Sequence, residues 1–242
     1  MKKKCVIIPA YNEGNNIEAL IGRIKAATDA DIIVIDDGSG DGTETIARQA
    51  GAYVICHPFN LGYSVALQTG YKFAYRNKYD LLLQMDGDGQ HPADSIPAFF
   101  DRLESGACDV LIGSRFLEAG RYQIGAAKNA AIGFFKLIIR MVNGAEISDP
   151  TSGFQCMSSR VYGLFTADRF LSDYPDANII IRLHRMGFRI AEMPVKMAEN
   201  PDGRSMHKGT FKILYYFFTT LLSIFIALIS EKEYSSEKEA KP

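Results

Sequence analysis

Two aspartates one residue apart, Asp86 and Asp88, follow a mostly apolar segment, residues 81–85. Both are followed by a glycine, which lets the backbone and a ligand come close. Carboxylate oxygens in this arrangement suit Mg²⁺ or Mn²⁺, with diphosphate oxygens and water completing the coordination. A calcium-like or purely solvated turn is the alternative. The place of the pair at the end of a predicted buried strand favours a site for Mg²⁺ or Mn²⁺.

A second polar segment, residues 36–43, reads Asp-Asp-Gly-Ser-Gly-Asp-Gly-Thr and leads from an apolar run into a helical pattern. Its small residues permit close backbone approach, and the helix N-terminus that follows offers free N–H groups. We assign the helix cap to Asp41 or Thr43 and a nucleoside contact to Asp37, with an ordinary acidic turn as the alternative. The dinucleotide and P-loop patterns are not met, which disfavours dehydrogenase and ATPase functions.

Regularly alternating elements must position these segments. Apolar β-branched runs predict strands, and the stretches between them predict helices, which together indicate βαβ units and a mostly parallel sheet covered on both faces. Ligands of such sheets bind beyond the carboxyl ends of the strands, where the polar clusters lie, so one composite site is expected. The predicted strands are 6–8, 32–35, 53–55, 81–83 and 110–112, and the predicted helices are 15–27, 42–50, 63–77 and 93–104.

The composition is that of one folded domain, except for the strongly apolar segment 211–230. The 242 residues carry a formal net charge of −1, with 47% hydrophobic and 23% charged residues. These values exclude a disordered tail, a collagen-like repeat and a polytopic membrane protein, and the absence of a basic surplus argues against nucleic acid as a partner. The four cysteines show no metal-type spacing and are expected to be free, buried thiols in a reducing cytosol.

The second half of the chain is less regular. We expect a helix over 177–186, a strand over 189–195 and a loop over 199–209. A helix over 125–142 carries Lys128, Lys136 and Arg140 among apolar residues. It would lie on an anionic membrane surface or, equally, pack on the sheet as an ordinary amphipathic helix.

Residues 211–230 form the most apolar segment, with Lys212 as their one charge. A helix of that length would span about 30 Å, the thickness of a bilayer core. Its Ser, Thr and Tyr residues fall on one stripe, which fits a helix in the membrane plane, a spanning helix with a partner, or a helix buried against the protein. We therefore divide the chain into a catalytic domain at 1–209, a membrane-associated helix at 210–230 and a charged tail at 231–242.

Six ordered motifs resemble the family-2 glycosyltransferases, which have the GT-A fold, an α/β fold with a mostly parallel central sheet and helices on both faces. The resemblance covers roughly residues 5–205 and extends to the dolichyl-phosphate mannosyltransferase branch. The motifs that carry it are Ile7–Glu13, Asp36–Ser39, Asn60–Gly62 with Ala66 and Gly70, Asp86–His91, Gly113–Phe116 and Asp149–Phe154.

The resemblance implies roles for individual residues. Asp86, Asp88 and Gln90 would hold Mg²⁺ or Mn²⁺, and Arg115 would bind a phosphate of the donor or the acceptor. The remaining donor-binding residues are expected to be Pro9, Tyr11, Glu13, Ile35, Asp37 and Gly87.

The late loop departs from the family pattern, because Met206 stands where a lysine is expected. Arg204 and Lys208 are the proposed substitutes for clamping the donor phosphates. Asp88, Asp149 and Arg115 are the candidate catalytic residues. Asp149 would act as a base, as an orienter of Arg115, or only as a turn-forming residue.

The function implied by the resemblance is inverting, metal-dependent transfer of a sugar from a GDP- or UDP-sugar to a polyprenyl phosphate. It would occur at the cytoplasmic face of the membrane, with residues 211–230 as the attachment and a homo-oligomer as a further possibility. A phosphate acceptor is largely dianionic near neutral pH and needs positioning more than a base. The alternatives are a glycan or protein hydroxyl acceptor, and a non-catalytic membrane scaffold that retains the fold.

Overall fold

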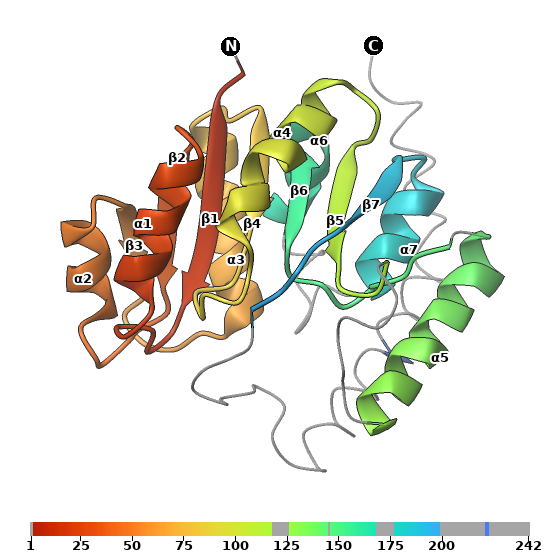
Figure 1. The fold of residues 1–242 in the computed structure, drawn as a ribbon, viewed down its shortest axis with the longest axis horizontal. Coiled ribbons are helices and arrows are strands. Elements are labelled where there is room, and N and C mark those ends of the chain that lie inside the picture. The colour runs from red at the N-terminus through yellow and green to blue at the C-terminus, as the bar shows by residue number, and fades with distance from the viewer. Residues whose placement is uncertain (1, 118–125, 145, 168–176, 199–220, 223–242) are drawn as a thin grey trace.

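The computed structural model describes residues 2–117, 126–144, 146–167, 177–198 and 221–222. Its centre is a seven-stranded sheet with strand order β3-β2-β1-β4-β6-β5-β7 (Figure 1). All neighbouring strands pair in parallel except at β6, which is antiparallel to both β4 and β5. This is the α/β architecture of the GT-A fold that the sequence predicted.

The five strands predicted in the first half are all present, as is the late one. The central strands β1, β2, β4 and β5 are mostly apolar on both faces and almost wholly buried, as expected for a sheet covered on both sides, whereas β3 and β7, at the two edges, are partly exposed. The strands are β1 (Lys4–Ala10), β2 (Asp31–Asp36), β3 (Tyr53–Cys56), β4 (Leu81–Gln84), β5 (Val110–Ser114), β6 (Gln155–Ser158) and β7 (Ile190–Pro194).

Helices cover the two faces of the sheet and define two apolar cores. On one face, α1 and α4 bury residues such as Leu20 and Phe99; on the other, α3, α5, α6 and α7 bury Leu67, Phe135 and Ile180. The described helices are α1 (Ile17–Ala27), α2 (Thr43–Gln49), α3 (Tyr63–Arg76), η1 (Ala93–Ser95), α4 (Ile96–Glu104), α5 (Ala126–Asn143), α6 (Ser159–Tyr162), η2 (Leu164–Thr166) and α7 (Ala177–Arg185).

Strand β6 was not predicted, and it decides how the site is assembled. It inserts between β4 and β5, pairing Gln84 with Gln155 and Leu111 with Cys156. Because β6 is antiparallel, its start lies at the edge where its parallel neighbours end. The Asp149–Phe154 loop therefore reaches the same edge as the loops that follow β1, β2, β4 and β5.

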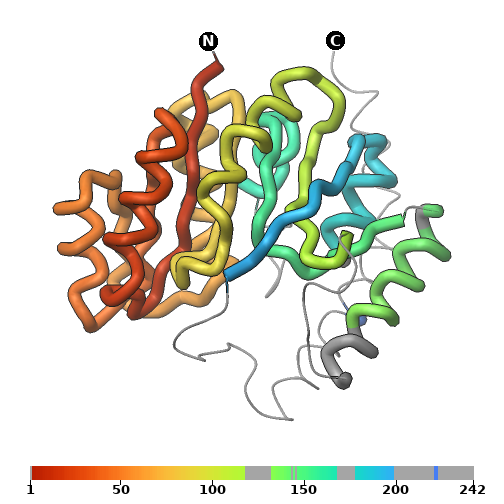
Figure 2. The backbone as a smooth tube through the Cα atoms, in the orientation of Figure 1, coloured from red at the N-terminus to blue at the C-terminus, as the bar shows by residue number. Residues whose placement is uncertain are grey.

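The chain path makes this edge easy to locate. In Figure 2 the tube runs from the red β1 to the blue β7, and both strands end on the lower side of the view. Helix α5 lies beside the β7 end of the sheet, and α2 lies at the opposite end (Figure 1).

The membrane segment predicted at 211–230 falls outside the described residues, apart from Leu221 and Leu222, which are helical. Within the described part of the chain, we find no helix of the length and apolarity that a membrane span requires. All four cysteines are free, as predicted, but Cys56 is exposed because it ends β3, the edge strand of the sheet.

Candidate active site

Asp86 and Asp88 lie in the loop that follows β4, and neighbouring groups fix the first of them. The Tyr63 hydroxyl donates to Asp86 Oδ1 at 2.8 Å. The Asp86 backbone N–H donates to His91 Nδ1 at 2.9 Å, and the Nε2 of that ring lies 3.7 Å from Asp86 Oδ2. His91 is buried, and burial lowers its pKa, so the neutral ring supports the loop without adding a charge.

Negative charge is concentrated at this loop. Burial raises the pKa of Asp88, and the nearby Asp86 carboxylate raises it further. Among the described residues, no lysine or arginine forms an ion pair with either aspartate. Two adjacent carboxylates without a balancing cation fit the ligand set of Mg²⁺ or Mn²⁺, so the residues present suit the predicted metal.

Gln90, the third predicted ligand, closes this loop. Its backbone N–H donates to Asp88 Oδ1 at 3.0 Å, and its carbonyl accepts from the N–H of Ala198 at 2.9 Å. The chain after β7 is thus fastened beside the Asp86–Gln90 loop, immediately before the predicted late loop begins. Arg204 and Lys208 lie in that late loop, outside the described residues.

Asp37, the predicted nucleoside contact, is buried at the end of β2, and both of its carboxylate oxygens accept hydrogen bonds from within the protein. His57 Nδ1 lies 2.7 Å from its Oδ1, and that oxygen also accepts from the Leu61 N–H at 2.9 Å. Its Oδ2 accepts from the Gly62 N–H at 2.8 Å. Asp37 therefore fixes the loop that leads into α3.

The loop after β1 lies against the loop formed by Asp86–Gln90. A Cβ at Gly87 would come within 3.2 Å of the Pro9 carbonyl oxygen and 3.3 Å of Glu13 Cγ, so glycine permits this approach. Tyr11 is half exposed at the same loop. Ile35, in contrast, places its side chain in the core, where its Cδ1 would lie 3.0 Å from a Cβ at Gly70.

Helix α3 joins these two parts of the site. Gly62, which donates to Asp37, directly precedes Tyr63, whose hydroxyl holds Asp86. A Cβ at Gly153 would lie 3.1 Å from an Asp86 carboxylate oxygen and 3.3 Å from the Tyr63 hydroxyl. The loop before β6 therefore packs against the same aspartate.

Arg115 and Asp149, two of the candidate catalytic residues, form a bidentate ion pair. The Arg115 Nε donates to Asp149 Oδ2 at 2.6 Å and one Nη donates to Oδ1 at 2.7 Å. The Arg115 backbone N–H also reaches Oδ2, at 3.1 Å, and the same Nη donates to the Thr151 hydroxyl at 2.8 Å. Asp149 is completely buried, whereas 12% of the Arg115 side chain is exposed. This geometry fixes the direction of the guanidinium.

Glu192, on β7, holds the turn that carries Asp149. Its Oε1 accepts from the Asp149 N–H at 2.8 Å and from the Ser148 hydroxyl at 2.9 Å, and its Oε2 accepts from the Ser148 N–H at 2.7 Å. The Ser148 hydroxyl in turn lies 2.5 Å from the hydroxyl of Ser114, at the end of β5. A chain of contacts thus connects β7 through Asp149 to Arg115.

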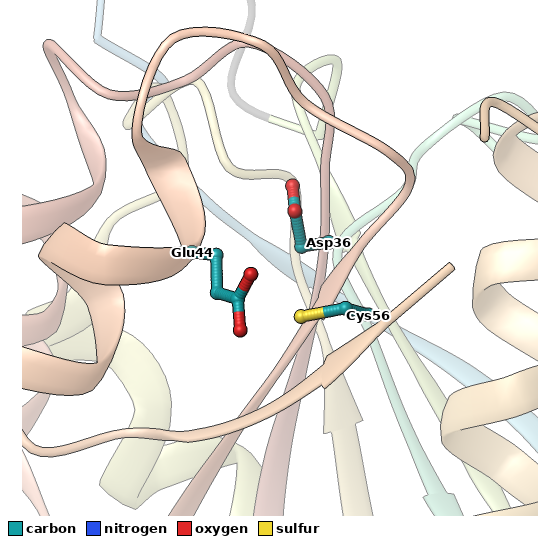
Figure 3. Close-up of side chains that lie close together, drawn as sticks. All are labelled: Asp36, Glu44 and Cys56. Atoms are coloured by element: carbon teal, nitrogen blue, oxygen red, sulfur yellow. The ribbon is translucent and has the colours of Figure 1, made fainter. Parts of the chain in front are cut away.

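A second group of metal-type side chains lies at the other end of the sheet. Figure 3 shows Asp36, Glu44 and Cys56, whose ligand atoms are within 4.8 Å of one another. Glu44 already accepts from Arg48 Nε at 3.0 Å, and Asp36 accepts from the Ser39 hydroxyl. Burial and a hydrogen bond to Glu44 raise the pKa of the Cys56 thiol to about 11, so the thiol stays protonated. Glu44 and Cys56 are thus linked to each other and to Arg48, and Asp36 to Ser39, so each of the three side chains already has a protein partner.

Sequence reasoning missed three residues that shape the site. Tyr63 follows the predicted Asn60–Gly62 motif directly, so its position was a usable signal. His57 has no recognisable partner in the local sequence pattern, yet its ring joins Asp37 to the Thr69 hydroxyl, which lies 2.9 Å from Nε2. Glu192 lies in a predicted strand and has no local signal at all, because its partners are more than 40 residues away.

Comparisons with known proteins identify the family of this chain. The glycosyl transferase family 2 model matches residues 5–162. The undecaprenyl-phosphate mannosyltransferase of Micrococcus luteus is 27% identical over 84% of this chain and 86% of its own. The polyprenol monophosphomannose synthase of Mycolicibacterium smegmatis is 28% identical over 86% of this chain and 82% of its own.

A solved structure supports the fold. Glucosyl-3-phosphoglycerate synthase from Mycobacterium tuberculosis, in complex with Mn²⁺, UDP-glucose and phosphoglyceric acid, superposes with a TM-score of 0.67. The match covers 92% of this chain and 80% of that one at 22% identity. Since the family model covers more than half of the sequence, the chain belongs to glycosyltransferase family 2 and is a glycosyltransferase.

Proposed function

We propose that this enzyme transfers a sugar from a nucleotide-diphospho-sugar to a polyprenyl phosphate, with inversion, at the cytoplasmic face of a membrane. The observation that carries the proposal is the position of the Arg115 guanidinium. Asp149 fixes it, and the loop from Asp149 to Phe154 also packs against Asp86 through Gly153. The two mannosyltransferases compared above take lipid phosphates as acceptors, according to their names. GDP- and UDP-sugars are both candidate donors.

Asp86, Asp88 and Gln90 would hold Mg²⁺ or Mn²⁺. When bound, the cation neutralises negative charge that develops on the departing diphosphate. The fit rests on two carboxylates without a cationic partner among the described residues. Tyr63 and His91 keep Asp86 in place, so the ligand oxygens are oriented before the donor arrives.

On the donor side, Pro9, Tyr11, Glu13 and Gly87 would form the floor of the nucleotide site, and Asp37 would set the shape of its wall. Asp37 acts in this proposal chiefly through the loop it fixes, since both of its oxygens already accept hydrogen bonds. Ile35 would support the site from the core. Arg204 and Lys208 would close on the diphosphate from the late loop, which begins next to Gln90.

The chemical step follows from the charge of the acceptor. An oxygen of the acceptor phosphate attacks the anomeric carbon while the bond from that carbon to the diphosphate oxygen breaks, and the electron pair leaves with the nucleoside diphosphate. A phosphate monoester has a second pKa of about 6, so no proton need be removed. Arg115 would orient the incoming phosphate and stabilise charge in the transition state.

Asp149 acts in this proposal as the residue that positions Arg115 and not as a general base. Both of its carboxylate oxygens accept hydrogen bonds from Arg115, and the side chain is completely buried. A base would need an oxygen free to face the acceptor. This arrangement favours a phosphate acceptor over a hydroxyl acceptor, which would require proton removal.

The test is transfer by the full chain in membranes supplied with labelled GDP- and UDP-sugars, undecaprenyl or dolichyl phosphate, and Mn²⁺ or Mg²⁺. We expect labelled lipid only with both substrates and the cation, and its loss on addition of EDTA. Label transferred to a glycan or protein hydroxyl in place of the lipid would contradict the acceptor. Undiminished transfer in EDTA would contradict the metal.

A further inference from the structure

A polar side chain lies in the apolar core just before the aspartate pair. Gln84, the last residue of β4, is buried on the face of the sheet that α3 covers, the same face as Leu82 two residues earlier. An apolar residue is the ordinary choice at such a position, because a buried amide without hydrogen-bond partners costs free energy. The partners of the Gln84 amide therefore indicate why a glutamine is present.

Two tyrosines of α3 bond to this amide. The Tyr71 hydroxyl donates to Gln84 Oε1, and Gln84 Nε2 donates to the Tyr63 hydroxyl in a longer bond of 3.4 Å. The Tyr63 hydroxyl in turn donates to Asp86 Oδ1 at 2.8 Å. These four side chains, which we call the Tyr71–Asp86 network, form a continuous series of hydrogen bonds from the buried core to the candidate metal site.

The direction of the bonds follows from the outer end of the network. A carboxylate ion only accepts hydrogen bonds, so the Tyr63 hydroxyl gives its proton to Asp86. The Tyr63 oxygen can then accept from the Gln84 amide N–H, which leaves Gln84 Oε1 to accept from Tyr71. Burial raises the pKa of Tyr71, so its hydroxyl keeps the proton that it donates. Each bond in the network thus has one donor and one acceptor.

Packing fixes the inner end of the network. Tyr71 is buried, and the centroid of its ring lies 5.4 Å from that of Phe165 in η2. The backbone of Gln84 belongs to the ladder between β4 and β6, in which it pairs with Gln155. Because side chains in a close-packed core have little room to move, the network connects the Asp86 carboxylate to a rigid part of the molecule.

We propose that Tyr71 and Gln84 are positioning residues of the metal site, which act through the Tyr63 hydroxyl to fix the orientation of the Asp86 carboxylate for a divalent cation. Neither residue is itself a ligand in this proposal. It rests on the metal role of Asp86 in the proposed function and identifies the residues that keep this ligand oriented. A carboxylate that is already oriented loses less freedom when a cation binds, so the network should raise the affinity for Mn²⁺ or Mg²⁺.

Binding of Mn²⁺ to the purified full chain in the presence of UDP or GDP, followed by electron paramagnetic resonance, tests this without the transfer reaction. Tyr63→Phe should weaken Mn²⁺ binding about tenfold, since the bond to Asp86 is lost. The double variant Tyr71→Phe, Gln84→Met should weaken it several-fold, although Tyr63 remains. This variant is expected to fold, because replacing both polar partners with apolar groups of similar shape is nearly neutral for stability.

The matched control is Tyr162→Phe. Tyr162 is also a buried tyrosine of this core, but its hydroxyl donates to the backbone carbonyl of Tyr79, which precedes β4 at the opposite end of the strand from Gln84. The control should lower the melting temperature and leave the Mn²⁺ affinity unchanged. An equal loss of Mn²⁺ affinity in Tyr162→Phe would show that the affinity follows stability alone, which would contradict the positioning role.

Asp86→Asn distinguishes failure of this inference from failure of the proposed function. If Asp86→Asn abolishes Mn²⁺ binding while the Tyr71→Phe, Gln84→Met variant binds as tightly as the unaltered protein, the network has no positioning role and the proposed function stands. If Asp86→Asn binds Mn²⁺ as tightly as the unaltered protein, or if the unaltered protein binds none, the metal role of Asp86 is refuted and this inference with it.

Discussion

The two ends of the catalytic edge are both organised by a buried aspartate, but by different means. Asp37, on the proposed donor side, is held by one imidazole and two backbone N–H groups that lie 20 to 25 residues along the chain. Asp149, on the proposed acceptor side, is held by a guanidinium 34 residues away, and its turn is fixed by Glu192 from 43 or 44 residues away.

The two aspartates therefore stabilise different features of the site: one the shape of a loop, the other the direction of a positively charged side chain. The donor-side carboxylate stabilises a loop of fixed shape, because backbone donors cannot move without the chain. The acceptor-side carboxylate stabilises the direction of a cationic side chain, part of which remains exposed. We infer that substitutions on the donor side change substrate binding, whereas substitutions on the acceptor side change the rate of the chemical step. We place Asp86 and Asp88 between the two sides, so substitutions there are expected to change both substrate binding and the chemical step.

The largest effect is expected where the two sides meet. Asp88→Asn should reduce transfer at least about a hundredfold, because the proposed cation loses a charged ligand. Thermal stability should be equal or higher, since repulsion from Asp86 disappears. Transfer rates, metal titration and melting temperature measure this. Asp94→Asn, an exposed carboxylate a few residues further along, is the matched control. Nearly full activity in Asp88→Asn would remove Asp88 from the metal site.

The next largest effect is expected at the acceptor-side ion pair. Asp149→Asn leaves a mostly buried guanidinium without its carboxylate and should lower the free energy of unfolding by about 3 kcal/mol. Transfer should fall by at least about tenfold. Denaturant unfolding and kcat measure the two effects.

Arg115→Lys distinguishes an orienting Asp149 from a base. Lysine keeps the charge but loses the planar fork, so kcat should fall to a similar degree as in Asp149→Asn. If Asp149 were a base, the asparagine variant would lose transfer while the lysine variant, which keeps the carboxylate, retained it. Nucleotide-sugar affinity should change little in either variant.

A smaller effect of the same kind is expected at Glu192. Glu192→Gln keeps the shape but replaces one accepting oxygen with an NH2 group, which cannot accept a hydrogen bond from the Ser148–Asp149 turn. We expect a loss of about 1–2 kcal/mol in unfolding free energy and a several-fold lower kcat, with the donor KM unchanged. Glu104→Gln, which removes a peripheral ion pair to Lys4, is the control. A change in donor KM alone would contradict a positioning role.

The smallest effect is expected on the donor side. His57→Ala removes one of the three donors to Asp37 and leaves both backbone donors in place. The unfolding free energy should fall by about 1 kcal/mol, and the donor KM should rise a few-fold while kcat stays constant. Steady-state kinetics with the donor varied tests this. A fall in kcat without a change in KM would show that the two sides do not divide the work as we infer.

The sequence predicted the donor side better than the acceptor side for a physical reason. The carboxyl ends of parallel strands lie at one edge of a sheet. The sequence therefore predicted that the loops at Pro9, Asp36 and Asp86 lie close together, because they follow the apolar runs Val6–Ile8, Ile32–Ile35 and Leu81–Leu83. In contrast, β6 is four residues long and antiparallel, and nothing in its local pattern predicts where it inserts. The position of Asp149 depends on that insertion.

By itself, the sequence determined the element order, the metal-type aspartate pair, the polar loops at the strand ends and the family. These are properties of local pattern and of βαβ topology. Only the tertiary structure decided that Asp149 is wholly engaged by Arg115, that Glu192 fixes its turn, and that Gln84 joins Tyr63 to Tyr71. Each depends on partners or burial set by residues distant in the chain, which side-chain type and spacing do not specify.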